Sequence, residues 1–372
     1  MLTFPEMQHM ANSLGKECVQ ASCEVILDSR SIVKRADPDV SLIIPVYNVR
    51  DYVGECLLSV LSNCHLISLE IIIIDDGSTD DSAVEISSLL RGRQDVQALF
   101  IRQDNQGLSA VRNLGAKLAR GRYLAFLDSD DFQMAGSLCK LYGFAQRQAC
   151  EVVLARSLVY DAKTQHAFPF YDQWVWDRLL GRAQVRVISR LEEPNLFLLE
   201  PNANYRLIRR DFFHSHRLCF PAGRLFEDPP VHLRMLALAS RIGLIADFHY
   251  IYRVNRPGKI TTQRGNTRFD ALEVALESLQ SMRDLNPPAA IGAAVLYSLI
   301  RAIWWCGGMT FPGQRHDFFS KASQIVRDNV PEDWLNDYWM LECPDSPSQR
   351  PVVDALMRAD VQKLVGLSVG MA

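Results

Sequence analysis

A short apolar segment that ends in three carboxylates constrains the fold of this chain more than any other feature. Residues 123–131 have the sequence Tyr-Leu-Ala-Phe-Leu-Asp-Ser-Asp-Asp. The five apolar positions are too few for a helix and show no polar face, which predicts a buried strand of a parallel sheet. Asp128, Asp130 and Asp131 would lie at its carboxyl end, where open α/β sheets bind ligands. Their mutual repulsion favours a bound cation, and their oxygens suit Mg²⁺ or Mn²⁺; the alternative is a solvated acidic turn.

The chain before this segment alternates between strand and helix patterns. Strand patterns occur at residues 40–46, 69–74 and 96–101, and helix patterns occur at residues 52–61 and 109–118. Strict alternation predicts parallel βαβ units with right-handed crossovers. Asn48 is expected to cap the first helix, and Ser78 or Thr79 a helix that follows the second strand. The loops that hold Tyr47, Asp76 and the three aspartates would then share one polar edge of the sheet.

A second acidic signal lies further along the chain. Phe226, Glu227 and Asp228 precede two prolines and an apolar helix pattern that extends to Leu238. Prolines are favoured in a first helical turn, and Asp228 occupies the position expected for an N-cap. The same carboxylate, held ionised by the helix N-terminus and facing a metal site, would be suited to accept a proton. The residues alone leave both roles open.

The rest of the chain carries weaker signals. Residues 166–176 are rich in aromatic side chains, which would form either a platform for the apolar faces of sugar rings or a local hydrophobic cluster. A cationic loop with Arg253, Arg256 and Lys259 would contact phosphate or remain solvated. We interpret His249 as a packed strand residue rather than a metal ligand. Helix patterns predict a helical C-terminal third, at residues 269–282, 288–305, 316–326 and 352–364.

The composition is that of a globular protein. Of 372 residues, 48% are hydrophobic and 22% are charged, and the net charge of −3 gives no field that would attract nucleic acid. Nine unpatterned cysteines and the lack of a signal-peptide pattern predict reduced thiols and a cytoplasmic location, with a peripheral contact at the cytoplasmic face of a membrane left open. The apolar stretch 291–311 contains Arg301, so we predict a buried helix rather than a membrane span. No pattern indicates an oligomeric state.

Five motifs together resemble those of family 2 glycosyltransferases, which have the GT-A fold. In chain order they are Val-Ser-Leu-Ile-Ile-Pro-Val-Tyr-Asn at 40–48, Ile-Asp-Asp-Gly-Ser-Thr-Asp at 74–80, Asn-Gln-Gly-Leu-Ser-Ala-Val-Arg-Asn at 105–113, the segment 123–131, and Phe-Glu-Asp at 226–228. The resemblance covers roughly residues 40–255. It implies a Rossmann-like, mostly parallel α/β sheet flanked by helices, with a C-terminal helical appendage.

The residue patterns, together with this resemblance, divide the chain into three parts. Residues 1–39 would be an N-terminal lead-in and linker with a short helix, residues 40–265 the glycosyltransferase domain, and residues 266–372 a helical region. Within the domain, residues 40–131 would bind the nucleotide sugar and residues 132–265 the acceptor.

The resemblance further implies roles for individual residues. The side chains expected to bind the nucleotide sugar are Pro45, Tyr47, Asn48, Asp76, Asn105, Arg112, Asp128, Ser129 and Arg253. Asp130, supported by Asp128, would bind the divalent metal, Mn²⁺ or Mg²⁺. Asp228 would be the catalytic base, and Glu227 would orient it. Residues 252–261 correspond approximately to an element that binds the diphosphate in related enzymes.

The implied reaction is an inverting, metal-dependent sugar transfer. The donor would be a nucleoside-diphosphate sugar, a UDP-sugar by resemblance, and the acceptor a hydroxyl of a glycan or lipid-linked saccharide in the synthesis of a surface polysaccharide. The alternative is a non-catalytic scaffold subunit that binds nucleotide sugars, although Asp128, Asp130 and Asp228 are all present. A sugar nucleotidyltransferase would need a glycine-rich, basic N-terminal loop, and a dinucleotide-dependent dehydrogenase a Gly-x-Gly-x-x-Gly motif after the first strand. Residues 44–48 contain neither.

Overall fold

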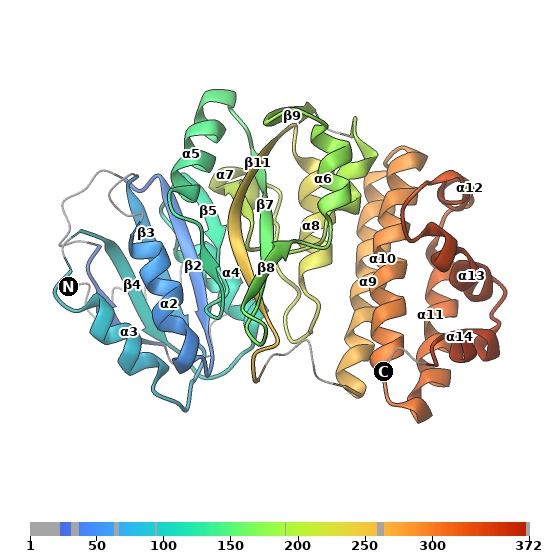
Figure 1. Ribbon diagram of the computed structural model, residues 1–372, viewed down its shortest axis with the longest axis horizontal. Coiled ribbons are helices and arrows are strands. Elements are labelled where there is room, and N and C mark those ends of the chain that lie inside the picture. The colour runs from blue at the N-terminus through green and yellow to red at the C-terminus, as the bar shows by residue number, and fades with distance from the viewer. Residues whose placement is uncertain are drawn as a thin grey trace.

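A computed structural model of the protein describes residues 23–30, 37–62, 67–93, 95–189, 191–258 and 264–369. One large sheet with its covering helices forms one part of the molecule, and a bundle of helices stands beside it (Figure 1). Helices α9 (Asp270–Leu285) and α10 (Ala289–Met309) form the side of the bundle that faces the sheet. Helix α8 (Asp228–Leu238) packs on α9 and so joins the two parts.

The sheet has eleven strands in the main order β1-β4-β3-β2-β5-β10-β7-β11-β6, with β8 paired to β7 and β9 to β11. Its strands are β1 (Glu24–Asp28), β2 (Val40–Val46), β3 (Leu69–Asp75), β4 (Gln97–Arg102), β5 (Tyr123–Phe126), β6 (Phe132–Gln133), β7 (Val152–Asp161), β8 (His166–Pro169), β9 (Val185–Ser189), β10 (Arg206–Arg209) and β11 (Arg241–Val254). Strands β2 to β5 pair in parallel, as the alternating pattern predicted. Every residue of β2, β3 and β5 is buried, because helices cover both faces of this part of the sheet.

The parallel strands reverse their order between β2 and β5, which are neighbours in the sheet. Helices α2 (Arg50–Leu61) and α3 (Ser82–Leu90) pack side by side, whereas α4 (Leu108–Leu118) packs on β2 and β3 and returns the chain to β5. The carboxyl ends of β2 and β5 therefore flank a topological switch point, which is where open α/β sheets bind ligands. The segment 123–131 ends at this point.

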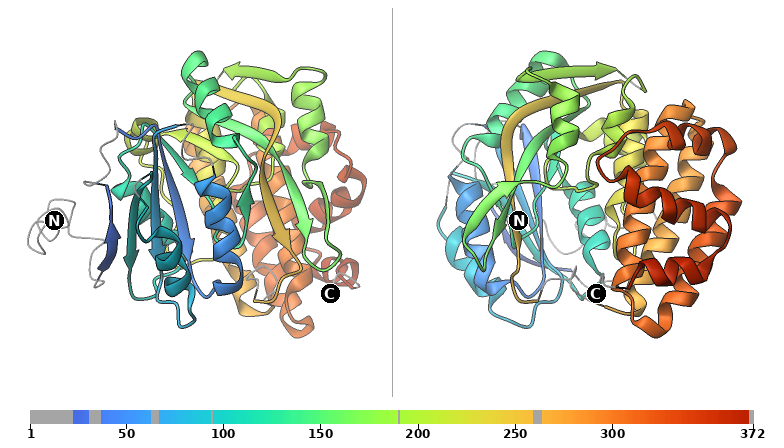
Figure 2. Two further views of the ribbon diagram at one scale, coloured as in Figure 1. Left: turned by 60° about the vertical axis from the view of Figure 1, so that its left-hand side comes forward. Right: turned by 45° about the vertical axis from the view of Figure 1, so that its right-hand side comes forward.

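The rest of the sheet departs from strict parallel alternation. Strand β10 lies between β5 and β7 and is antiparallel to both. Strand β1 adds an antiparallel edge next to β4 (Figure 2). It comes from the segment for which a short helix was expected, and residues 24–28 form a strand instead because β4 offers an unpaired edge. Strand β11 is one long strand, and it bulges between its two halves.

Three predicted helix caps are not formed. Asn48 has a left-handed backbone (φ 51°), and its side-chain oxygen accepts a hydrogen bond from the Thr79 N–H at 2.8 Å, so it ties two loops together. Helix α2 begins after Val49 and α3 after Asp81, both without a side-chain cap. Asp228 is likewise the first residue of α8 rather than its cap, which leaves its carboxylate available to other partners.

The remaining helices of the sheet domain are α5 (Ser137–Gln148), α6 (Gln173–Leu180) and α7 (Arg210–Ser215). The C-terminal bundle continues with α11 (Arg315–Asn329), α12 (Glu332–Met340), α13 (Ser346–Met357) and α14 (Val361–Leu367). Helix α12 was not predicted, and the pattern at 352–364 is divided between α13 and α14. Among the described residues α10 alone is long and apolar enough to cross a membrane, and 61% of its most apolar window is buried. Gly292 lets α10 approach α12, because a Cβ there would lie 2.2 Å from the Trp334 ring.

Candidate active site

One buried arginine joins the two acidic motifs. Arg112, on α4, is 1% exposed and donates from Nη1 to Glu227 Oε1 at 2.7 Å and to Asp228 Oδ1 at 3.0 Å. Its Nη2 donates to Asp128 Oδ1 at 2.7 Å. Burial alone would lower the pKa of the Arg112 guanidinium, but the three carboxylates outweigh it and raise that pKa. One cation among three carboxylates leaves a negative site that favours a further positive charge or a proton.

Asp128 is fastened by a second residue, Asn204, which the sequence analysis did not single out. The Asn204 amide donates to Asp128 Oδ2 at 2.9 Å, and the Asp128 N–H donates to Asn204 Oδ1 at 3.0 Å. Asn204 also donates to the Tyr250 hydroxyl at 3.1 Å. An asparagine that is 1% exposed needs polar partners of this kind. The signal for it was a pair of polar residues, Asn202 and Asn204, shortly before strand β10.

The other two aspartates of the motif have different surroundings. Asp131 accepts hydrogen bonds from the Arg253 N–H at 2.7 Å and from the Tyr250 hydroxyl, so it ties the end of β5 to β11. Asp130 forms an ion pair between its Oδ2 and Arg256 Nε at 2.5 Å. Arg253 donates from Nε to the Asp130 carbonyl oxygen at 2.8 Å. We infer that Asp131 has a structural role, whereas Asp130 is paired with the Arg256 side chain, which another cation could replace.

Arg253 and Arg256 both lie against the aromatic ring of Tyr52, at 5.4 and 5.0 Å from its centroid. Arg253 is 7% exposed and is further paired with Glu55, so most of its donors serve the fold. Arg256 has a single carboxylate partner among the described residues, Asp130. The predicted diphosphate contact of residues 259–261 lies outside the described residues.

The carboxylates provide hard oxygen donors, which fit Mg²⁺ or Mn²⁺ held together with substrate phosphates. Within the part of the chain that the structure describes, no group of three or more His, Cys, Asp or Glu side chains is placed to hold a metal ion. A metal ion at this place would therefore be held by Asp130 and by oxygens of the substrate phosphates. Asp130 would then give up its contact with Arg256. His249 is buried in β11, and burial lowers its pKa to about 3.

The residues expected to bind the nucleotide lie on neighbouring loops. Pro45 is buried in β2, whereas the Tyr47 side chain, just after this strand, is 50% exposed. Asp76 accepts three hydrogen bonds, from Gln103 Nε2 at 2.7 Å and from the N–H groups of residues 106 and 107 at 2.9 and 2.8 Å. Asp76 thus holds the loop that presents the exposed Asn105. Ser129 is buried beside Asp128.

Glu227 and Asp228 are raised in pKa by burial. Asp128 also raises the pKa of Asp228, whereas Arg112 opposes the shift in both. The Asp228 side chain remains 22% exposed, against 9% for Glu227, so Asp228 is the carboxylate open to a substrate. A base with a raised pKa accepts a proton more readily once it is ionised.

Long-range contacts hold the loop before this pair. Phe226 has a left-handed backbone (φ 63°), which is uncommon for a bulky residue and is held by tertiary contacts. The guanidinium of Arg268 lies 5.4 Å from the Phe226 ring centroid and 4.5 Å from that of Trp305 on α10. The Phe226 and Trp305 rings meet edge to face at 6.0 Å. Asp270, at the start of α9, accepts a hydrogen bond from the N–H of residue 225 at 2.9 Å.

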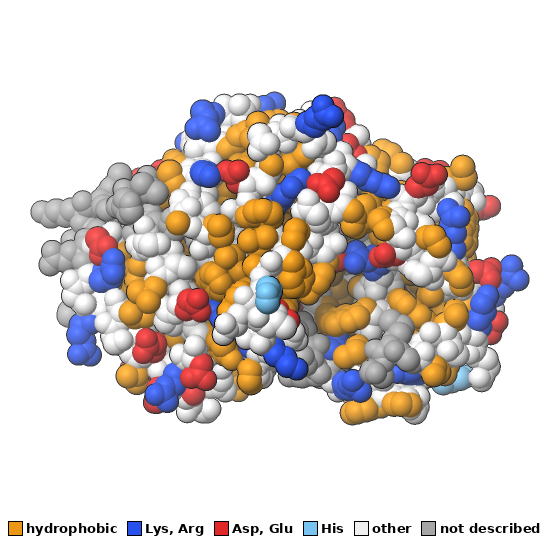
Figure 3. All heavy atoms as spheres, viewed as in Figure 1, with side chains coloured by type: hydrophobic (Ala, Val, Ile, Leu, Met, Phe, Trp, Pro, Cys, Tyr) orange, Lys and Arg blue, Asp and Glu red, His pale blue; other side chains and the backbone are white. Residues whose placement is uncertain are grey.

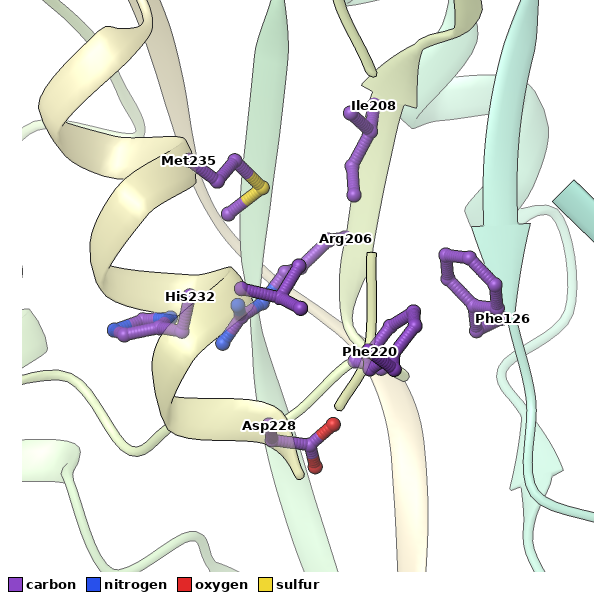
Figure 4. Close-up of a pocket in the computed structure, with 9 residues that line it drawn as sticks. Phe126, Arg206, Ile208, Phe220, Asp228, His232 and Met235 are labelled. Atoms are coloured by element: carbon purple, nitrogen blue, oxygen red, sulfur yellow. The ribbon is translucent and has the colours of Figure 1, made fainter. Parts of the chain in front are cut away.

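A small cavity lies behind Asp228 (Figure 4). Its volume is about 10 Å³, and its lining includes Phe126, Arg206, Phe220 and His232. A space of this size holds one water molecule at most, so it is not a substrate site. Burial lowers the pKa of His232, and the nearby Arg206 lowers it further. Arg206 also acts to lower the pKa of Asp228, against the effect of burial.

Comparison with known proteins agrees with this geometry. Residues 41–213 match the family model for glycosyl transferase family 2. The glycosyltransferase GlyG of Streptococcus pneumoniae is 30% identical over 236 residues, which are 62% of this chain and 74% of GlyG. The chain belongs to glycosyltransferase family 2. It is a glycosyltransferase, as the five motifs indicated. The family match ends before Glu227, so the acidic pair and the C-terminal helices lie beyond it.

Solved structures confirm the GT-A fold of this family 2 member. Staphylococcus aureus TarS 1-349 in complex with UDP-GlcNAc superposes with a TM-score of 0.70 at 18% identity, covering 89% of this chain and 90% of TarS 1-349. The mannosyltransferase PcManGT of Pyrobaculum calidifontis, in complex with GDP-Man and Mn²⁺, superposes with a TM-score of 0.51 at 13% identity, covering 90% and 85%. The superposition on TarS covers 89% of this chain, which is more than the sheet domain alone, so it extends into the C-terminal helices.

Proposed function

We propose that this glycosyltransferase inverts configuration and moves a sugar from a UDP-sugar to a hydroxyl of a glycan or lipid-linked saccharide. The observation that carries the proposal is the position of Arg112, which brings Asp128, Glu227 and Asp228 into one site. A carboxylate on the proposed donor side and a partly exposed one on the proposed acceptor side thereby bind different nitrogens of one guanidinium. This is the arrangement that a direct displacement at an anomeric carbon needs.

Asp228 is the proposed catalytic base. It takes the proton of the acceptor hydroxyl while that oxygen forms a bond to the anomeric carbon. The bond from this carbon to the diphosphate oxygen breaks, and its electron pair leaves with the nucleoside diphosphate. Because attack and departure occur on opposite faces, configuration inverts. Arg112 favours the ionised form of the base, and Glu227, which binds the same guanidinium, is proposed to keep the base oriented.

The donor site is proposed at the switch point of the sheet. Tyr47, Asn48, Asp76 and Asn105 border it from the loops after β2, β3 and β4. TarS in complex with UDP-GlcNAc supports a UDP-sugar, whereas the complex of PcManGT with GDP-Man makes a GDP-sugar the natural competitor in a test. Pro45, Ser129 and Arg253 are buried, so we propose that they shape this site rather than bond the nucleotide.

A divalent metal at Asp130, supported by Asp128, is part of the proposal, and PcManGT in complex with Mn²⁺ supports it. When bound, such an ion neutralises charge that develops on the leaving diphosphate. Arg256, released from Asp130, and Arg112 supply further positive charge next to it. The resemblance to family 2 supports three further parts of the proposal. They are the acceptor class, a role in the synthesis of a surface polysaccharide, and a location in the cytoplasm or at the cytoplasmic face of the membrane.

The test is a titration of the full chain with UDP-sugars and GDP-sugars, with Mn²⁺ and with a chelator, followed by calorimetry. We expect one UDP-sugar to bind with Mn²⁺ and binding to weaken in Asp130→Ala. Arg50→Met, an exposed change near the same loops, is the control. Metal-independent binding unaffected by Asp130→Ala would remove the metal from the proposal. Tight donor binding without hydrolysis or transfer to any acceptor would favour a scaffold subunit.

A further inference from the structure

We propose that the hollow between the sheet domain and the C-terminal helices binds the acceptor as a saccharide of at least two units, with Trp305 and Tyr171 stacking on successive sugar rings. The inference rests on the proposed function and specifies its acceptor. Figure 3 shows this hollow, bordered by hydrophobic side chains, between the part of the surface over β7 and β8 and the C-terminal helices.

Trp305 forms the wall nearer to the proposed base. Its indole is 40% exposed although Arg268 stacks on it at 4.5 Å, so the exposed area lies on the opposite face and the ring edge. Trp305 contacts Phe226, which precedes Asp228 by two residues. An exposed indole beside a buried charged cluster is costly to hydrate and is a good stacking surface for the apolar face of a pyranose ring.

Tyr171 forms the other wall. It is 53% exposed and lies 6.5 Å, between ring centroids, from Phe168, which is 40% exposed. The Phe170 ring backs Tyr171 at 5.1 Å and contacts the Tyr252 ring at 5.6 Å. The Tyr252 ring lies 6.4 Å from the Tyr250 ring, whose hydroxyl donates to Asp131, so this aromatic row starts beside the acidic motif. The aromatic stretch 166–176 thus contributes an exposed platform as well as core side chains.

A charged pair connects the two walls. Asp172, next to Tyr171, accepts a hydrogen bond at 3.1 Å from the N–H of Glu200. The Glu200 carboxylate pairs with Arg301 on α10 at 2.8 Å, and both side chains are about a quarter exposed (27% and 28%). Arg301 precedes Trp305 by four residues, so the two lie on the same face of α10. At least one turn of α10, about 5.4 Å, and an ion pair therefore lie between the two aromatic side chains, which suits them to successive sugar rings.

The chemistry of this hollow favours a saccharide over a lipid chain or a peptide. A saccharide presents apolar ring faces to Trp305 and Tyr171 and hydroxyl groups to the partly exposed Glu200 and Arg301, which are already oriented by their pairing. An acyl chain would leave this ion pair without partners in an apolar contact. The hydroxyl that reacts would lie next to Asp228, with the following sugar unit towards Tyr171.

The experiment uses the full chain, and binding to a glycan array in the presence of UDP and Mn²⁺ first selects a saccharide. The KM values of that saccharide and of its terminal monosaccharide, both as p-nitrophenyl glycosides, are then compared. We expect a lower KM for the longer acceptor. Trp305→Leu should raise the KM of both acceptors about tenfold, and Tyr171→Ala should raise only that of the longer one. Met340→Ala, an exposed apolar side chain on α12, is the control.

Each result supports or overturns the inference. Trp305→Phe should recover most of the acceptor affinity, because an aromatic ring is retained. A fall in kcat with unchanged acceptor KM in Trp305→Leu would make Trp305 a support for Phe226 only and would overturn the proposal. Equal KM values for the two acceptors, or no glycan retained on the array, would also overturn it. If the wild type neither bound a nucleotide sugar nor transferred a sugar, that result would instead contradict the proposed function.

Discussion

The two acidic motifs of the site are positioned in different ways. Asp128 follows a short buried strand, and its orientation is set by its strand, by Arg112 from the next helix before it, and by Asn204. Asp228 follows an irregular loop with a left-handed residue, and contacts from α9 and α10 hold that loop. The parallel half of the sheet thus carries the proposed donor side, with one partner from beside the antiparallel β10, whereas the proposed acceptor side depends on the helical bundle. The comparison predicts that changes in the bundle will alter transfer and leave donor binding intact.

The largest effect is expected at Asp228. Asp228→Asn removes the proton acceptor while preserving size and most hydrogen bonds, so kcat should fall by about 10³-fold or more, within the range of general base catalysis. Donor affinity, measured by calorimetry, should remain within twofold, because the donor side is built from other elements. Turnover at the wild-type rate would show that Asp228 is not the base, and a parallel loss of donor binding would break the separation of the two sides.

Arg112 is where the two sides meet, so its loss should affect both. Arg112→Met would leave Glu227 and the partly buried Asp128 and Asp228 without their shared cation, and breaking a buried ion pair typically costs about 3–5 kcal/mol of stability. Urea unfolding measures this. Arg50→Met is a matched control, because the ion pair of Arg50 with Asp81 is exposed and should contribute less than about 1 kcal/mol. Equal stability of the two variants would mean that the carboxylates are satisfied without Arg112.

Asp172 is a buried carboxylate that, within the described part of the chain, forms no ion pair with an arginine. Burial, and then Glu200, raises its pKa to about 7, and its Oδ1 has no hydrogen-bond partner among the described residues. The folded state therefore holds the proton more tightly than the unfolded state. Between pH 4 and pH 7 this lowers the free energy of unfolding as pH rises, by roughly 4 kcal/mol at most.

The measurement is a series of urea unfolding curves across this pH range for the wild type and Asp172→Asn. The variant has no titrating group at this position, so its decline in stability should be shallower than that of the wild type. The difference should be absent below pH 4, where the carboxyl is protonated in both states. Parallel curves would show that Asp172 titrates near its ordinary value and that the acceptor side tolerates its charge.

The smallest of the four effects is expected at Arg268, which connects the bundle to the loop before Asp228. Arg268→Met removes the cation between the Phe226 and Trp305 rings but keeps a long side chain, and kcat should fall about tenfold with unchanged donor affinity. Arg224→Met is the control from the same loop, because its contact with Glu277 is exposed. Wild-type kcat in Arg268→Met would mean that the loop is held without the bundle, and the comparison would fail.

Much of the parallel half could be predicted from sequence because its interactions are local or repeat along the chain. The β-branched runs at 40–46 and 69–74 are buried on both faces, so composition alone marks them as central strands. The helix patterns follow a single apolar stripe. In contrast, β1 was missed because its strand depends on pairing with β4, far away in the sequence. Asn48 was assigned to a cap because its use by Thr79 requires two loops to meet.

The sequence by itself determined the fold family, the alternation of β2 to β5 with their helices, and the residue types of both acidic motifs. Only the tertiary structure decided which carboxylates share a partner. Asp128, Asp130 and Asp131 are adjacent in sequence, yet Arg112, Arg256 and Arg253 each hold a different one. The physical reason is that the role of a carboxylate depends on which hydrogen-bond donors lie within reach of it. Here those donors come from α4, from the stretch after β11 and from β11 itself. The same holds for Phe226, whose conformation is held by helices that follow it in the chain.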